Sequence, residues 1–198
     1  MKRYYYHGIG ELTCCLWKML EIIKSGELKT RNNMIKDNYE KYNHVCLYKK
    51  NESFDYNDEN NFLHSALSSW IEHCWFFIIS PEIPAIKTKY SNRVGFDDSE
   101  EPMSDIVDEW RSVGSIPFSK IVGIGIPFDS ILEEEKRFGF VEDMNFNYVS
   151  FKEFYELLKK LQEYAKKQNW IIVNSDEKGI CDKIDEQLNN SNLKHQNM

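Results

Sequence analysis

The chain lacks the features that would place a protein in a membrane, outside the cell or on nucleic acid. No apolar run approaches the about 18 residues that a membrane helix needs, and the start from Met1 to Tyr6 lacks the apolar core of a signal peptide. Positive charge is also scarce. The 25 Lys and Arg residues against 32 Asp and Glu residues leave a net charge of −7, which disfavours nonspecific binding to nucleic acid. We therefore expect a soluble, cytoplasmic protein with no membrane partner.

The sequence also has no cysteine pattern typical of a disulfide framework or a zinc site. Its five cysteines are an odd number and include no Cys-x-x-Cys pair. His44 and Cys46 stand two residues apart, but no second pair has the spacing of a structural zinc site. The acidic run at 97–105 lacks the alternating ligands and the central glycine of a calcium loop. We expect free thiols and no resident metal.

Apolar residues, by contrast, are plentiful enough to build a core. Among 198 residues, 41% are hydrophobic and 14% are aromatic, which fits one compact domain. We assign residues 1–182 to this domain. The end of the chain, residues 183–198, is rich in Asn and Gln, and we expect it to be a disordered polar tail.

Hydrophobic periodicity predicts both helices and strands. Apolar residues recur at helical spacing over residues 11–24 and 150–168, and Ser150 followed by Glu153 predicts a capping box at the start of the second helix. The continuous apolar run Trp75–Ile79, closed by Ser80-Pro81, predicts a central strand that is buried on both faces.

Shorter patterns complete the predicted architecture. Further strands are expected near residues 4–7, 45–49, 109–113, 119–126 and 170–173, a helix near 62–71, and mobile polar loops at 29–43 and 97–105. The strands at 109–113 and 119–126 are separated by a short turn, so we expect them to be neighbours. Because helices and strands do not alternate regularly, the fold class is α+β.

Three strand segments, taken in order, resemble a known family of enzymes. They are Tyr4-Tyr5-Tyr6-His7-Gly8, Val45-Cys46-Leu47-Tyr48 and Asp108-Glu109-Trp110-Arg111-Ser112. Their order and spacing, over about residues 4–127, resemble the ADP-ribosyltransferase superfamily. The likeness is greatest to the branch that carries a histidine, a tyrosine and a glutamate on three core strands. The resemblance implies a split β-sheet core with flanking helices, and NAD as a substrate.

The resemblance also implies roles for four residues. His7 would hydrogen-bond the ribose and carboxamide side of NAD, Gly8 would offer its backbone to the nicotinamide amide, Tyr48 would stack on the nicotinamide ring, and Glu109 would be the catalytic acid, with His7 and Tyr48 completing the catalytic set. A carboxylate at the ribose 2′-OH suits this chemistry, because cleavage of the nicotinamide–ribose bond passes through an oxocarbenium-like centre.

The sequence departs from the family pattern in three places. Ile9 stands where the family often has Thr or Ser after His-Gly, and Val107 stands where a second acid or Gln would precede Glu109. The latter weighs against arginine as the acceptor. The segment around Tyr48 lacks the usual neighbouring residues. Four other aromatic residues could take the stacking role: Tyr39, Tyr42, Phe54 and Tyr56.

The sequence thus predicts a mono-ADP-ribosyltransferase that transfers ADP-ribose from NAD to an unidentified protein or nucleic acid. Two alternatives stay open: a catalytically silent domain of the same fold that binds a protein partner, and an RNA 2′-phosphotransferase-like enzyme, which would need more than the five arginines present. An intracellular toxin with an antitoxin or inhibitor partner, a phage product and an effector exported by a non-classical route all fit the sequence.

Overall fold

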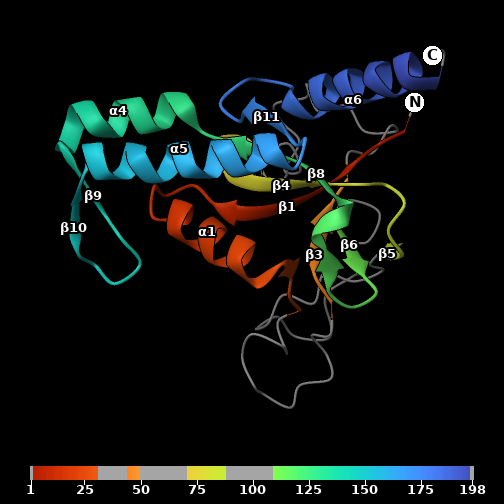
Figure 1. Cartoon of the computed structure of the whole chain (residues 1–198), viewed down its shortest axis with the longest axis horizontal. Coiled ribbons are helices and arrows are strands. Elements are labelled where there is room, and N and C mark those ends of the chain that lie inside the picture. Colours follow the sequence, from red (N-terminus) through yellow and green to blue (C-terminus); the bar gives the residue numbers. More distant parts are fainter. Residues whose placement is uncertain (1, 31–43, 50–70, 88–108, 197–198) are drawn as a thin grey trace, which may run out of the picture.

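The fold is built on a mixed sheet of seven strands in the order β11-β8-β4-β1-β3-β6-β5, seen in the computed structural model in Figure 1. The structure describes residues 2–30, 44–49, 71–87 and 109–196. In chain order the strands are β1 (Tyr5–Gly10), β3 (Cys46–Tyr48), β4 (Trp75–Ile79), β5 (Ala85–Lys87), β6 (Glu109–Ser112), β8 (Ile121–Ile126) and β11 (Ile171–Asn174).

Four α-helices and two small sheets complete the described part of the chain. The helices are α1 (Cys15–Ser25), α4 (Phe128–Phe138), α5 (Phe151–Lys167) and α6 (Ile180–Gln196), and a 3-10 turn spans Phe118–Lys120. The small sheets pair β2 (Glu27–Leu28) with β7 (Ile116–Pro117), and β9 (Phe140–Glu142) with β10 (Tyr148–Ser150). Because β8 and β11 pair in parallel while the other pairings are antiparallel, the predicted α+β class is confirmed.

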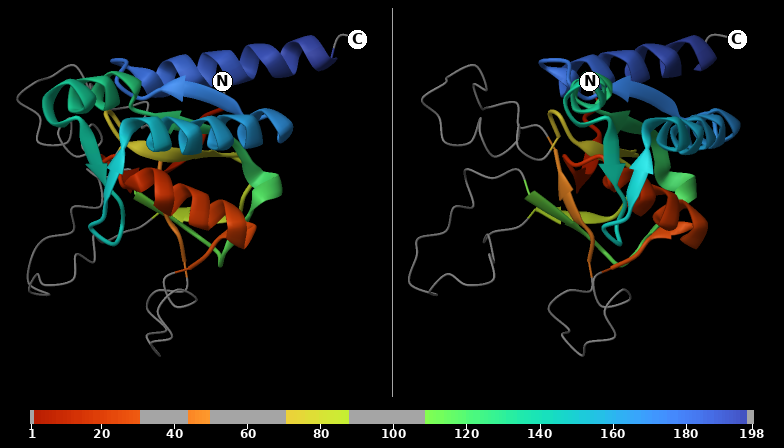
Figure 2. Two further views of the ribbon diagram at one scale, coloured as in Figure 1. Left: turned by 60° about the vertical axis from the view of Figure 1, so that its left-hand side comes forward. Right: turned by 90° about the vertical axis from the view of Figure 1, so that its left-hand side faces the viewer.

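The predicted central strand is confirmed as β4. It lies between β1 and β8, and all five of its residues are buried. Its alternate side chains enter two core clusters, one on each face of the sheet. Helices α1 and α5 contribute to the cluster that holds Phe77, and α6 contributes to the cluster that holds Phe76 and Ile78 (Figure 2). A strand covered on both faces needs the unbroken apolar run seen in the sequence.

The strongest local signals of the sequence are also confirmed. Strands form at or near all of the predicted positions. Helix α5 falls within its predicted amphipathic stretch, and α1 overlaps the other and ends one residue beyond it. The capping box is present, because the Ser150 hydroxyl accepts a bond from the Glu153 N–H (3.3 Å) and the Glu153 carboxylate accepts one from the Ser150 N–H (3.2 Å). The helix predicted near 62–71 and the loops predicted at 29–43 and 97–105 lie almost entirely outside the described residues.

One predicted pairing is wrong. The strands β6 and β8 are not neighbours, since β3, β1 and β4 stand between them. Gly114, with a φ of +80°, redirects the chain after β6, and Ile116-Pro117 then pairs with Glu27-Leu28 as β7 and β2. The chain then returns to the sheet on the other side of β1, where β8 pairs with β4.

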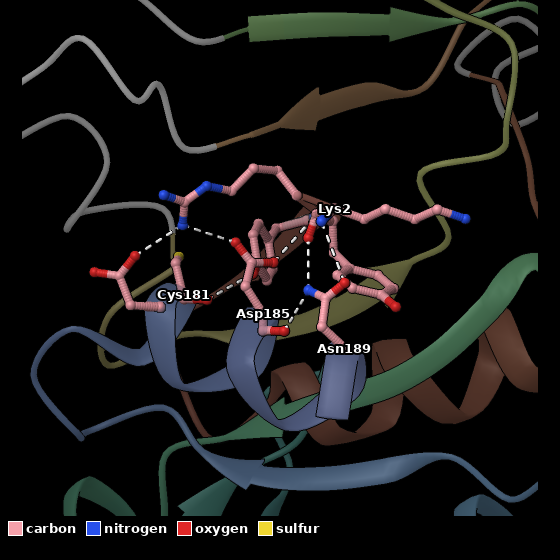
Figure 3. A network of polar contacts seen from close by, with 8 residues as sticks. Lys2, Cys181, Asp185 and Asn189 are labelled. Carbon is pink, nitrogen blue, oxygen red and sulfur yellow. Dashed lines mark hydrogen bonds and ion pairs between the residues drawn. The ribbon is translucent and has the colours of Figure 1, made fainter. Parts of the chain in front are cut away.

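The prediction of a disordered tail from residue 183 also disagrees with the structure, in which α6 continues to Gln196. Figure 3 shows the contacts that tie this helix to the start of the chain. Asp185 is buried and accepts a bond from the Tyr4 N–H (3.1 Å), while the Asn189 side chain bonds both the Lys2 N–H (3.2 Å) and the Lys2 carbonyl (2.9 Å). Polar side chains that are typical of a tail thus form hydrogen bonds with backbone groups 180 or more positions away in sequence.

Candidate functional site

The site suggested by the sequence lies where the ladder between β1 and β3 ends. These strands share one register pair in the described part of the chain, Tyr6 with Tyr48, whereas β1 and β4 share five. Just beyond that pair, His7 Nδ1 lies 2.9 Å from the Cys46 carbonyl oxygen. The imidazole therefore bridges from β1 to the backbone of β3 at the point where their ladder ends.

This contact fixes the tautomer of the neutral His7 ring. A carbonyl oxygen only accepts, so Nδ1 must donate, which leaves Nε2 as an acceptor in the neutral ring. Burial lowers the pKa of His7 below its ordinary value. The bond to Cys46 opposes that shift, and the nearby Lys18 ammonium adds to it. His7 is therefore neutral near pH 7 and offers one lone pair, at Nε2, to a hydroxyl or amide donor.

Gly8 lies next to a β-bulge in β1. It pairs with Phe76, but the next pair joins Gly10 to Trp75, so Ile9 is the extra residue. The Ile9 side chain is buried in the core cluster shared with α1, and its carbonyl accepts a bond from Lys18 Nζ (3.5 Å). Its place in the core explains why an apolar residue stands at this position of β1.

Tyr48 and Glu109 are brought together by the sheet. They are register partners on the adjacent strands β3 and β6, which places their Cα atoms about 4.5–5.5 Å apart. Tyr48 is half-buried and packs against the core cluster beneath α6. Segments that are separated in sequence by residues 49–108 therefore meet at one position of the sheet.

His7 does not share a face with Tyr48. Side chains alternate along a strand, and Tyr6, the register partner of Tyr48, belongs to the cluster beneath α6. His7 therefore lies on the opposite face, on the side of Tyr5, Ile9 and α1. The structure makes the three strands neighbours, but their register places His7 on one face of the sheet and the Tyr48–Glu109 pair on the other, where the β1–β3 ladder ends.

An aromatic pair on the face of His7 was missed by the sequence analysis. The Tyr5 and Trp110 rings meet edge to face with centroids 5.6 Å apart, and Lys49 Nζ lies 5.0 Å and 5.1 Å from their centroids. Lys49 already covers these rings, so we assign the pair to packing. The four alternative stacking residues, Tyr39, Tyr42, Phe54 and Tyr56, lie outside the described residues.

A second polar cluster, which the sequence also did not reveal, is centred on Asp176. Its carboxylate accepts bonds from the Asp129 N–H (2.7 Å), the Ser130 N–H (3.2 Å), the Ser130 hydroxyl (2.7 Å) and His73 Nδ1 (2.8 Å). These donors include the second and third backbone amides of α4, so Asp176 caps that helix. The cap joins residues 46 or more positions apart, which no local pattern encodes.

Comparison with known protein families, with curated proteins and with solved structures finds no match to this chain. In the described segments, no three His, Cys, Asp or Glu side chains come together as a metal site. None of the described helices is both long enough and apolar enough to cross a membrane.

Proposed function

We propose that the protein is an NAD-dependent mono-ADP-ribosyltransferase, in which the short β1–β3 ladder divides the seven-stranded sheet into two halves. The supporting observation is that β1, β3 and β6, whose sequences carry the resemblance, are consecutive strands of the sheet. The sheet pairs Tyr48 with Glu109 and sets His7 against the β3 backbone. NAD is the substrate and binds where the β1–β3 ladder ends, and the acceptor of ADP-ribose is an unidentified protein or nucleic acid.

The proposed chemistry assigns one task to each residue. Neutral His7 accepts a hydrogen bond from the ribose or the carboxamide at Nε2, and the Gly8 backbone contacts the nicotinamide amide. Tyr48 stacks on the nicotinamide ring. Glu109 binds the ribose 2′-OH and stabilises the positive charge that develops at the anomeric carbon as nicotinamide leaves, an interaction that strengthens only in the transition state.

Replacing Glu109 by Gln tests this proposal most directly. The substitution keeps the size of the side chain but removes its charge, so NAD hydrolysis and transfer should fall by about 10²–10³ while NAD affinity and the melting temperature change little. His7→Ala should weaken NAD binding as well as the rate, because His7 contacts the ground-state cofactor. The rates are measured by release of nicotinamide and by intact-mass analysis of acceptors.

Glu101→Gln is the matched control, because it removes another acid of the segment that precedes β6. It should leave activity unchanged. Full activity in Glu109→Gln, or an equal loss in Glu101→Gln, would show that Glu109 is not the catalytic acid.

A second candidate is a catalytically silent domain of the same fold that binds a protein partner. The placement of His7 and Tyr48 on opposite faces of the sheet favours it. Absence of both nicotinamide release and ADP-ribose transfer by the wild-type chain would decide for this candidate.

The RNA 2′-phosphotransferase alternative has less support. Such an enzyme needs several arginines for phosphate groups, and Arg3 is already engaged by Asp182 (2.9 Å) and Asp185 (3.0 Å).

A further inference from the structure

The outer face of the β9–β10 hairpin is unusually apolar. Of the exposed large hydrophobic residues in the described chain, most lie on α4 and this hairpin rather than around the sheet. We call five of them the aromatic hairpin patch: Phe138 (52% exposed), Phe140 (41%), Met144 (45%), Phe146 (81%) and Tyr148 (72%). In Figure 1 the hairpin extends from the body at the left-hand side, below α4. Exposed apolar side chains that gather on neighbouring elements mark interaction sites, whereas single scattered ones do not.

Side chains of the hairpin point alternately toward the body of the protein and away from it. Val141 is buried and Val149 packs against the same core cluster, so the inner face is attached to the body. Phe140 and Tyr148, on the outer face, meet edge to face with centroids 4.7 Å apart. Outward positions of a hairpin that is covered on one side only are normally polar. Here two of the four outward strand positions, Phe140 and Tyr148, are aromatic, and their register partners Ser150 and Glu142 are polar.

Local hydrogen bonds hold the tip of the hairpin in one conformation. The Asp143 carboxylate accepts bonds from the Asn145 N–H (2.8 Å), the Asn147 N–H (2.9 Å) and the Asn147 side-chain amide (3.0 Å). Phe146, at the tip, has a φ of +62°, a left-handed conformation that is uncommon for a bulky residue. The most exposed aromatic ring is thus presented by an ordered loop, which lowers the entropy cost of binding.

We infer that the aromatic hairpin patch is the interface of a two-fold symmetric dimer, with a second copy of this chain as its occupant. The exposed fractions of the five side chains add up to about three whole side chains, and an aromatic side chain buries about 150–250 Å², so each copy offers about 450–750 Å². Two copies together would bury about 900–1,500 Å², a range that includes the ~1,200 Å² at which specific interfaces begin.

The charges that border the patch complement each other under two-fold symmetry. At the base of the hairpin, Arg137 lies over the Phe138 ring (5.0 Å), while Glu142 and Asp143 lie toward the tip. If the hairpins pack antiparallel, the base of one copy faces the tip of the other, which sets Arg137 of each copy against Glu142 of the other. In such an isologous interface every favourable contact occurs twice. The inference does not depend on the proposed enzymatic function.

Sedimentation velocity of the full chain across micromolar concentrations tests the dimer. We expect a reversible dimer whose dissociation constant rises at least about 100-fold in Phe146→Ser/Tyr148→Ser, since central aromatic residues dominate interfaces. Leu12→Ser and Ile86→Ser are the matched controls, because these apolar side chains are equally exposed (69% and 66%) but lie outside the hairpin. They should leave the dissociation constant unchanged.

Charge reversal gives an independent test that requires no loss of apolar surface. Arg137→Glu and Glu142→Arg should each weaken the dimer about tenfold, and the double variant should restore it, because each copy then carries the reversed pair. A monomeric wild type would overturn the inference, and so would a dimer that survives Phe146→Ser/Tyr148→Ser or that Ile86→Ser disrupts equally. A monomer that cosediments with phosphatidylcholine vesicles would assign the patch to a lipid surface instead.

Discussion

At the scale of single residues, the glycines of β8 show how packing dictates sequence. A Cβ on Gly125 would overlap the ring of Phe76, and one on Gly123 would lie 2.8 Å from both the Ile171 carbonyl oxygen and the Ile78 side chain. Gly123-Ile124-Gly125 is therefore a close-packing pattern of the central sheet. The Asp176 cap and the His7 contact also depend on single side chains. Asp176 bonds the start of α4, and His7 bonds the backbone of β3.

Gly125→Ala should consequently destabilise the fold by about 1–3 kcal/mol, the usual cost of overpacking a closed core. Urea unfolding followed by tryptophan fluorescence measures this cost. Ile86→Ala is the control, and its free energy of unfolding should stay within about 0.5 kcal/mol of the wild type, because the Ile86 side chain is exposed. Equal stability of Gly125→Ala and wild type would show that β4 and β8 are less closely packed than the structure indicates.

At the scale of elements, α4 depends on a charge supplied from outside the helix. Burial alone raises the pKa of Asp176, but the bonds from Ser130 and His73 outweigh it, and the net pKa is lowered. A lowered pKa in the folded state means that the carboxylate stabilises the fold above its unfolded pKa, near 3.9, and that this contribution is lost as the pH falls through the folded value.

Asp176→Asn should therefore lower the free energy of unfolding by about 1 kcal/mol at neutral pH, the scale of a helix cap. The difference from wild type should shrink below about pH 4, where the wild-type carboxyl begins to be protonated. Urea unfolding at a series of pH values measures it. Glu133→Gln, at an exposed position of the same helix, is the control and should show no such trend. A difference that is independent of pH would contradict the role of the charge.

At the scale of the whole molecule, NAD should stabilise the fold, because the proposed site combines residues of three strands and exists only in the folded chain. A ligand at about 100 times its dissociation constant adds about 2.7 kcal/mol to the free energy of unfolding. The Glu109→Gln variant is the protein to use, since it should bind NAD without consuming it. Thermal melting with and without NAD measures the effect, and His7→Ala, added to that variant, should reduce it. A melting temperature that millimolar NAD leaves unchanged would argue for the catalytically silent alternative.

The sequence by itself determined the elements whose signals are local. The apolar run of β4, the stripes of α1 and α5 and the Ser150–Glu153 cap follow from residues within one or two turns, so the fold class could be predicted. The strand positions of His7, Tyr48 and Glu109 could be predicted for the same reason. Helix α4 was not predicted because Ile131 is its one fully buried residue, which leaves a short apolar stripe. The β9–β10 hairpin was not predicted because its strands are three residues long and expose Phe140 and Tyr148.

Only the tertiary structure decided how these elements combine. The order of the sheet sets β6 beside β3 rather than β8, and the register places His7 and Tyr48 on opposite faces. The polar end of the chain forms α6, where Asp185 and Asn189 hydrogen-bond the backbone of residues 2–4. The physical reason is common to all three. Backbone pairing and buried polar contacts join residues that are far apart in sequence, and their energy depends on neighbours that no local window contains.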